Sequence, residues 1–365
     1  MFDVRRKILN WVEPWVRMSV AGIDISDLSV KFIKFRQSKN IAIEFFGESS
    51  IAEGIIVNGE IKDEDKLIKV LEEMVSTEKR LRYLPVVASL PEEKSFLRLI
   101  QLPKVDRGKI ENAVRWEIEA NIPLSPEELW YDHEVIEPLE DHLDHVDVVV
   151  TAFPRALVES YIRVFKRAGF FTMALELESQ AIVRSVIADL RVRPAEIIVD
   201  MGRTRTGIII VSGGAIIFTT TVGLGGRILD NNISRALGVN QEKAVAIKKE
   251  QGASRRAEDG KVFSAVLPAM SVLADEIKRA VEYYVHQGPH LHGASPIINT
   301  VLLTGGDANL KGLDTYLSSA LKIPTRLADP WVTIKNRLDT VVPSIPRNKA
   351  LAFTTAIGLA LRGIR

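Results

Sequence analysis

Residues 21–35 read AGIDISDLSVKFIKF, and this stretch decides the fold because it places an acid in the turn of a buried hairpin. An apolar strand leads into Asp24, a short polar turn follows, and an alternating strand carries Lys31 near its start. An Asn-Gly turn would join two such strands more simply. The acid and the hydroxyl groups therefore raise the question of whether the chain contains a second turn of this kind.

A second turn of this kind lies within residues 196–226, EIIVDMGRTRTGIIIVSGGAIIFTTTVGLGG. A strand leads into Asp200, a second strand follows, and a Gly-Gly turn connects it to a third strand. Helical patterns follow both meanders, so Asp24 and Asp200 occupy equivalent places in two halves that share little sequence identity. The pattern predicts an α/β protein with an internal duplication, in which the two turns face each other across a cleft that holds phosphates and a metal ion.

The overall composition is that of an ordinary globular protein. The chain has 365 residues, which suggests two or three domains, and a net charge of +1. Nucleic-acid binding is not expected, because it requires clustered Lys and Arg. The absence of cysteine excludes disulfides and thiolate chemistry. No stretch reaches the roughly 18 apolar residues that a membrane span needs.

The first 20 residues are expected to form an amphipathic N-terminal extension. Phe2, Leu9 and Trp15 could share one face, although Pro14 would break or kink a helix there. Two interpretations stay open. The extension could dock on a membrane surface or on a partner, or it could pack on its own domain or stay loosely tied.

The two turns carry the groups that a nucleoside triphosphate with Mg²⁺ requires. Phosphates need closely approaching backbone N–H groups together with hydroxyl or Lys donors, and Mg²⁺ needs carboxylates, which it often meets through retained waters. The candidate metal-facing residues are Asp24 and Asp200. The candidate nucleotide-binding residues are Asp24, Ser26, Ser29 and Lys31 in the first turn and Asp200, Gly202, Thr204, Arg205 and Thr206 in the second.

A third candidate element is VLLTGGDANLKGL, residues 301–313. Gly305 and Gly306 lie between a strand and a helix, and Asp307 follows as the expected N-cap. Glycines there would let a flat adenosine lie against the backbone, and a helix N-terminus favours a nearby phosphate. The sequence contains neither a P-loop nor a G-x-G-x-x-G dinucleotide fingerprint after its first strand.

The order and spacing of these elements resemble the actin-like ATPases, whose phosphate-1, phosphate-2 and adenosine motifs match Asp24, Asp200 and Thr304–Gly306. The resemblance is closer to the PilM family of type IV pilus assembly proteins, relatives of FtsA. PilM-like features include SFLRLIQLP (95–103) leading to EANIPL (119–124), GLGG (223–226), QEKAVAIKKEQG (241–252) and LKIPTRLADPWVTI (321–334). The match runs from Ala21 over nearly the whole chain. It adds Gly225, Gly226 and Lys248 to the expected nucleotide contacts.

The resemblance implies an actin-like, ribonuclease-H-like duplicated fold of two lobes with an inserted strand-helix-strand-strand subdomain. Lobe 1 is expected over 21–187 with the insert at about 84–170. Lobe 2 is expected over 194–345 with an outer subdomain at about 227–261. The final helix, residues 350–365, is expected to return to lobe 1. The implied role is a cytoplasmic scaffold, peripheral at the inner membrane, that binds ATP and Mg²⁺ and grips the N-terminal tail of PilN beside the insert.

Whether ATP would be hydrolysed stays open, because turnover needs a group that positions water. The resemblance puts residues 176–186 on a connecting helix. Glu176 and Gln180 would share one face of it and are the candidate catalytic residues, whereas Glu178 would point away. Self-association stays open. Two alternative functions remain, an FtsA-like membrane tether in cell division and a small-molecule kinase of the same superfamily.

Overall fold

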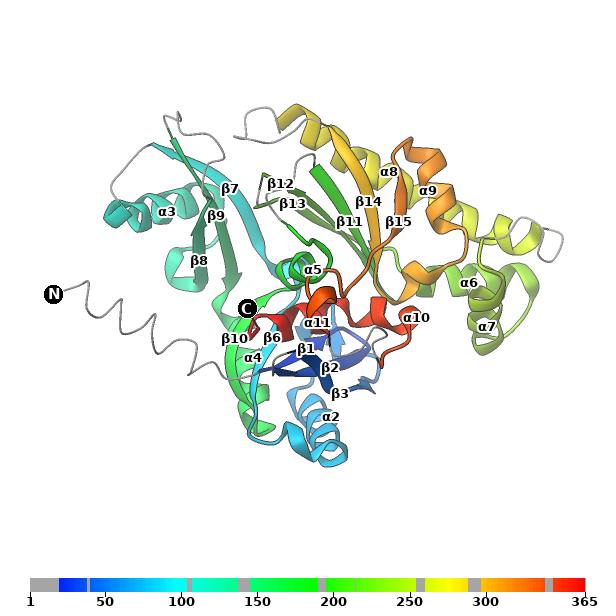
Figure 1. Cartoon of the computed structure of the whole chain (residues 1–365), viewed down its shortest axis with the longest axis horizontal. Coiled ribbons are helices and arrows are strands. Elements are labelled where there is room, and N and C mark those ends of the chain that lie inside the picture. The colour runs from blue at the N-terminus through cyan, green and yellow to red at the C-terminus, as the bar shows by residue number, and fades with distance from the viewer. Residues whose placement is uncertain are drawn as a thin grey trace.

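The computed structural model describes residues 20–37, 40–103, 107–136, 145–189, 195–213, 215–253, 260–287, 297–338 and 344–364. Figure 1 shows two sheets, one from each half of the chain, with helices packed around them. The expected N-terminal extension lies outside the described residues except for Val20, so both of its interpretations stay open. In the part of the chain described, no helix is long and apolar enough to cross a bilayer.

Lobe 1 is built on the opening hairpin. Its sheet has the strand order β10-β6-β1-β2-β3. The strands are β1 (Ala21–Ile25), β2 (Ser29–Gln37), β3 (Ile41–Ser50), β6 (Pro85–Leu90) and β10 (Phe171–Leu177). The first three form an antiparallel meander with Asp24 opposite Lys31, and β6 and β10 add in parallel beside β1. The sheet thus places the carboxylate and the lysine at the same end of the hairpin.

Lobe 2 repeats this topology in the order β13-β12-β11-β14-β15. The strands are β11 (Ala195–Met201), β12 (Thr206–Ser212), β13 (Ala215–Val222), β14 (Ile298–Thr304) and β15 (Thr325–Leu327). Again an antiparallel meander comes first, and two strands add in parallel beside its first member. Asp200 lies near the end of β11 as Asp24 lies near the end of β1. The duplication predicted from the two turns is confirmed.

Helices pack on these sheets and on one another. In lobe 1, α2 (Glu64–Thr77) begins at Asp63, whose side chain accepts a hydrogen bond from the backbone N–H of Lys66 at 3.0 Å. The other helices are α4 (Arg155–Arg167) and α5 (Glu178–Val186) in lobe 1, and α6 (Gly226–Leu237), α7 (Gln241–Gln251), α8 (Lys261–Gln287) and α9 (Leu313–Leu321) in lobe 2. The pair α6 and α7 forms the outer end of lobe 2 (Figure 1), where the outer subdomain was expected.

The inserted subdomain is shorter than predicted. It is a three-stranded sheet in the order β7-β9-β8 with one helix, so its strand-helix-strand-strand order is as expected. The elements are β7 (Phe96–Pro103), α3 (Arg107–Asn121), β8 (Leu129–Val135) and β9 (His145–Pro154). The expected limits of about 84 and 170 are wrong because β6 is a strand of the lobe 1 sheet. Helix α4 also belongs to lobe 1, where Tyr161 and Phe165 are buried in its core.

The C-terminal segment returns to lobe 1 earlier than predicted. Lobe 2 was expected to reach residue 345, but Trp331, Ile334 and Ile345 pack in one apolar cluster with Phe35 of β2 and Ile357. The chain then forms α10 (Arg347–Ala350) and α11 (Thr354–Leu361). The last helix lies against lobe 1, since α11 packs on β1 and α5.

Close backbone packing fixes α11 in place. A Cβ atom on Gly22 of β1 would collide with the backbone of Ala356, and one on Gly358 would collide with the carbonyl of Ala181 in α5. Only glycine allows this approach. The last helix therefore joins the first strand to the helix that follows β10, and all three elements border the space between the lobes.

Candidate functional site

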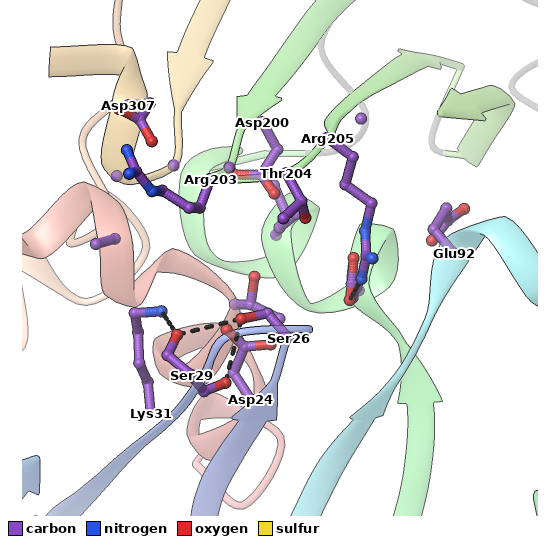
Figure 2. A pocket seen from close by; sticks show the side chains of 18 of the residues that line it. Asp24, Ser26, Ser29, Lys31, Glu92, Asp200, Arg203, Thr204, Arg205 and Asp307 are labelled. Atoms are coloured by element: carbon purple, nitrogen blue, oxygen red, sulfur yellow. Dashed lines mark hydrogen bonds and ion pairs between the residues drawn. The ribbon is translucent and has the colours of Figure 1, made fainter. Parts of the chain in front are cut away.

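A cleft of about 370 Å³ lies between the two lobes, within the range of small-molecule sites. Figure 2 shows Asp24 and Asp200 entering it from opposite lobes. Most predicted nucleotide contacts line this cleft. They are Asp24, Ser26, Ser29, Lys31, Asp200, Gly202, Thr204, Arg205, Gly305, Gly306 and Asp307. The central geometric prediction, that the acids of two distant hairpins face one shared space, is confirmed.

The first turn is held by its own hydroxyl groups. The backbone N–H of Ser26 donates to the carbonyl of Ser29 at 2.9 Å, and the two Oγ atoms lie 3.1 Å apart. Lys31 Nζ donates to Ser29 Oγ at 2.6 Å (Figure 2). It also lies 3.5 Å from the carboxylate of Glu48. The turn thus presents a cation and two hydroxyls to the cleft, which are suitable donors for phosphate oxygens.

The charge of Asp24 destabilises the charge of Asp200. Burial raises the pKa of Asp24, opposed by Lys31 and by a 3.0 Å hydrogen bond from Ser89 Oγ. Burial and the charge of Asp24 raise the pKa of Asp200 to about 7. Two carboxylates that repel across a cleft favour a cation between them. Over the described part of the chain, no group of three or more His, Asp or Glu is placed to hold a metal alone. An ion at Asp24 and Asp200 would therefore take further oxygens from water or phosphate, which suits Mg²⁺.

The glycine turn fits a flat ligand. Gly305 has φ of +90°, and a Cβ there would meet the backbone of Met201. A Cβ on Gly306 would meet only Ala352, at 3.5 Å, so this residue leaves an open backbone surface beside the cleft. Gly305 N–H donates to the carbonyl of Leu351 at 3.1 Å, which ties this turn to the segment before α11.

Four predicted contacts do not line the cleft. The Thr206 hydroxyl is fully buried and donates to the carbonyl of Leu224 at 2.5 Å. Gly225 and Gly226 allow α6 to start against the second turn, since Gly226 N–H donates to the Gly202 carbonyl at 3.0 Å. The remaining residue is Lys248, which is buried behind Asp307 at 2.5 Å and Asp230 at 3.0 Å. These four residues were expected to contact the nucleotide. In this structure they support the turns from behind and do not line the cleft.

The Arg205 side chain also differs from expectation. It borders the cleft, but its guanidinium lies against three carboxylates of lobe 1. The distances are 3.1 Å to Asp27, 2.7 Å to Glu93 and 3.6 Å to Glu178. Burial lowers the pKa of Arg205, but these acids raise it further, so the net shift is upward. In this structure Arg205 serves the contact between the lobes.

The predicted water-positioning residues are misplaced. Glu176 belongs to β10 and not to the helix, and its buried carboxylate pairs with Arg184 at 2.5 Å and Arg362 at 2.6 Å. Gln180 does not line the cleft, whereas Glu178 at the start of α5 does. The error arose from assuming that the helix begins at residue 176. With the helix beginning at 178, the side chain expected to point away is the one that faces the cleft.

Two functional candidates were missed from the sequence. Glu92 is buried and accepts hydrogen bonds from the backbone N–H of Ser179 at 3.1 Å and from its hydroxyl at 3.0 Å. Arg203 lines the cleft and pairs with Asp230, which is fully buried. No local signal marks either residue, because each acquires its role from a partner far away in the sequence.

The raised pKa of Asp200 predicts a pH-dependent stability. The carboxyl ionises near pH 4 in the unfolded chain but near pH 7 in the fold, so stability falls as pH rises between these values. Asp200→Asn should therefore raise the nucleotide-free melting temperature at pH 8 by about 2–4 °C, with the gain vanishing toward pH 4. Differential scanning fluorimetry from pH 4 to 8 measures this. The exposed Asp275→Asn is the control, and a gain that is equal at all pH values would contradict the assignment.

Comparison with known proteins agrees with this architecture. The family model described as type IV pilus assembly protein PilM matches residues 22–364. The structure of a PilM–PilN type IV pilus biogenesis complex is similar with a TM-score of 0.77 and 23% identity, covering 96% of this chain and 99% of that chain.

Two more distant structures share the fold. Ethanolamine utilization protein EutJ from Carboxydothermus hydrogenoformans gives a TM-score of 0.56 at 17% identity, covering 94% of this chain and 89% of that one. MreB5 of Spiroplasma citri bound to ADP gives a TM-score of 0.55 at 14% identity, covering 87% of this chain and 94% of that one. These matches confirm the predicted actin-like fold of two lobes. The family model matches nearly the whole of this chain, which shows that the chain belongs to the PilM family of type IV pilus assembly proteins.

Proposed function

We propose that this protein is an ATP-binding scaffold of type IV pilus assembly that acts at the cytoplasmic face of the inner membrane. One observation carries the nucleotide part of the proposal. Two carboxylates from duplicated hairpins, Asp24 and Asp200, line the same cleft as Lys31 and the glycine turn at Gly305 and Gly306. Membership of the PilM family supports the pilus role and removes the basis for the division-protein and kinase alternatives.

Each group has a role that its chemistry supports. Mg²⁺, when bound, would neutralise phosphate charge and join the nucleotide to Asp24 and Asp200. Lys31 and the hydroxyls of Ser26 and Ser29 would bind phosphate oxygens from lobe 1. Gly306 would leave room for the adenosine. Because these donors belong to both lobes, a bound nucleotide would contact both lobes, and its presence would change their relative position.

Glu178 is the residue best placed to position water if the chain hydrolyses ATP. Its carboxylate borders the cleft, and burial raises its pKa well above the usual range. A carboxyl of raised pKa is suited to proton transfer at neutral pH. The nearby guanidinium of Arg205, at 3.6 Å, opposes this shift. Turnover would thus depend on how firmly Arg205 holds Glu178.

A membrane partner would bind beside the inserted subdomain. The solved PilM relative is a complex with PilN, and we propose that the cytoplasmic N-terminal tail of PilN is the partner here. Strand β10 is an edge strand of the lobe 1 sheet, and it exposes Phe171 by 60% and Met173 by 50%. An unpaired edge with alternate apolar side chains is suited to an extended peptide. The tail would fix this protein to the membrane.

The nucleotide assignment predicts that ATP–Mg²⁺ binding depends on Asp200. Asp200→Ala should weaken binding by about tenfold or more, the scale seen when a carboxylate that orients a metal's ligands is removed. Isothermal titration with ATP, with and without Mg²⁺, measures this. Asp275→Ala on the surface of α8 should bind as the wild type does. If Asp200→Ala binds ATP as tightly as the wild type, or if the wild type does not bind ATP, the nucleotide assignment is wrong and the protein is a nucleotide-free scaffold.

The partner assignment predicts that apolar side chains of β10 bind the tail. Phe171→Ser with Met173→Ser should weaken binding of a synthetic peptide of the PilN cytoplasmic tail by about five- to tenfold, because anchors of this kind dominate peptide interfaces. Fluorescence anisotropy with a labelled peptide measures the affinity. The control is Val272→Ser, which removes an exposed side chain of α8 in lobe 2. An unchanged affinity in the double variant would place the tail elsewhere.

The role of Glu178 predicts a separation of binding from turnover. Glu178→Gln should retain ATP affinity within about twofold and lower any hydrolysis rate by about 100-fold, the scale of general base catalysis. Phosphate release over hours at saturating ATP measures the rate. Gln180→Ala on the same helix should keep the wild-type rate, because its side chain lies outside the cleft. A loss of turnover in Gln180→Ala alone would restore the sequence prediction.

A further inference from the structure

The contact between Arg205 and three carboxylates crosses from one lobe to the other. Arg205 belongs to the β11–β12 turn of lobe 2, whereas Asp27, Glu93 and Glu178 belong to three separate segments of lobe 1. All four side chains are at least 85% buried. We name this group the Arg205 latch. One guanidinium faces three acids, so the loss of Arg205 would leave a strong mutual repulsion inside the contact.

The latch is ionic and incompletely hydrogen-bonded. Arg205 Nη1 and both carboxylate oxygens of Glu93 make no aligned hydrogen bond, although the ions are within contact distance. Asp27 is more firmly fixed, since it accepts from the backbone N–H of Gly59 at 3.0 Å. A second cavity of about 290 Å³ borders Arg205, Glu93 and Lys94. Arg205 therefore has incomplete bonding and space to move toward another anion.

One short element connects the latch to the inserted subdomain. The helical turn η2 (Glu92–Lys94) carries Glu93 of the latch and lies directly before β7 of the insert. Its Glu92 caps the start of α5 through Ser179 and also hydrogen-bonds the side chain of Thr219 in β13. Strand β13 of lobe 2 in turn packs on β7. A shift of lobe 2 thus acts on η2 and β7 together.

We propose that Arg205 holds the lobes closed in the absence of nucleotide and transmits the state of the cleft through η2 to the inserted subdomain. The inference rests on the proposed function for its biological meaning, because the insert flanks the proposed site of the partner tail. A bound triphosphate offers Arg205 a competing anion within the same cleft. The two states then differ in which anion pairs with Arg205, which is the differential interaction that coupling between two sites requires.

The latch itself is tested without nucleotide or partner, by hydrogen exchange measured with mass spectrometry. In Arg205→Gln, amides of η2 and β7 should exchange about tenfold faster or more than in the wild type, since removing one partner of a buried charge group opens the contact. Arg205→Lys keeps the charge but loses the planar fork of the guanidinium. Its amide exchange rates should lie between those of the wild type and those of Arg205→Gln. The matched control is Arg227→Gln, because Arg227 pairs across the lobes with Glu53 at 2.5 Å but is exposed.

The outcomes separate this inference from the proposed function. Unchanged exchange at η2 and β7 in Arg205→Gln overturns the latch, even if ATP binds well. Faster exchange confined to the β11–β12 turn, with β7 unaffected, overturns the transmission to the insert. Should Arg205→Gln fail to fold, Arg205→Lys and Glu93→Gln provide the same comparison. A failure to bind ATP contradicts the nucleotide assignment alone, because the latch is measured in its absence.

The coupling is then tested with the PilN tail peptide. In the wild type a non-hydrolysable ATP analogue with Mg²⁺ should change the peptide affinity, and in Glu93→Gln this change should fall to less than about twofold. The affinity without nucleotide should shift toward the value that the wild type shows with the analogue, because the weakened contact no longer holds the nucleotide-free state. An undiminished nucleotide effect in Glu93→Gln overturns the assignment of η2 as the connection.

Discussion

The proposed site depends on the repulsion between two carboxylates that belong to distant parts of the chain. Asp24 and Asp200 come from matching positions in two sheets, and both enter one cleft from opposite sides. Asp24 is buried and Asp200 is half-buried, and burial together with the charge of Asp24 raises the pKa of Asp200 to about 7. A fold with this arrangement has an unfavourable charge distribution until a cation arrives. That cost is the physical reason to regard the cleft as a site and not as a packing defect.

The basic side chains in and behind the cleft each lie close to an acid. Lys31 lies on the first hairpin near Asp24, and Lys248 supports Asp307 from behind the glycine turn. Arg205 lies among acids of the opposite lobe. The cleft therefore combines a first lobe that supplies phosphate donors with a second lobe that supplies the closing contact. This division of roles suits a scaffold whose shape would respond to a bound nucleotide. It is less suited to an enzyme with rapid turnover.

Much of this could be predicted because the decisive signals are local. A strand that leads into an acid, a polar turn and an alternating strand can be recognised twice along the sequence, and the glycines of residues 305–306 mark a third turn. The order of these signals predicted the duplication, and the family resemblance predicted the returning last helix. Errors arose where a side chain's direction depends on a boundary of one or two residues, as for Glu176 and Glu178 at the junction of β10 and α5.

The sequence by itself determined the two hairpins and the glycine turn, because strand periodicity and turn chemistry are properties of neighbouring residues. Its resemblance to known proteins indicated the family. Tertiary structure alone decided which side chains the cleft receives. Arg205 and Thr204 stand one residue apart, yet Arg205 lies among three acids from three segments of lobe 1. The limits of the insert were likewise set by which strands join the lobe 1 sheet. Contacts of this kind depend on the relative position of whole lobes, and no short stretch of sequence encodes that position.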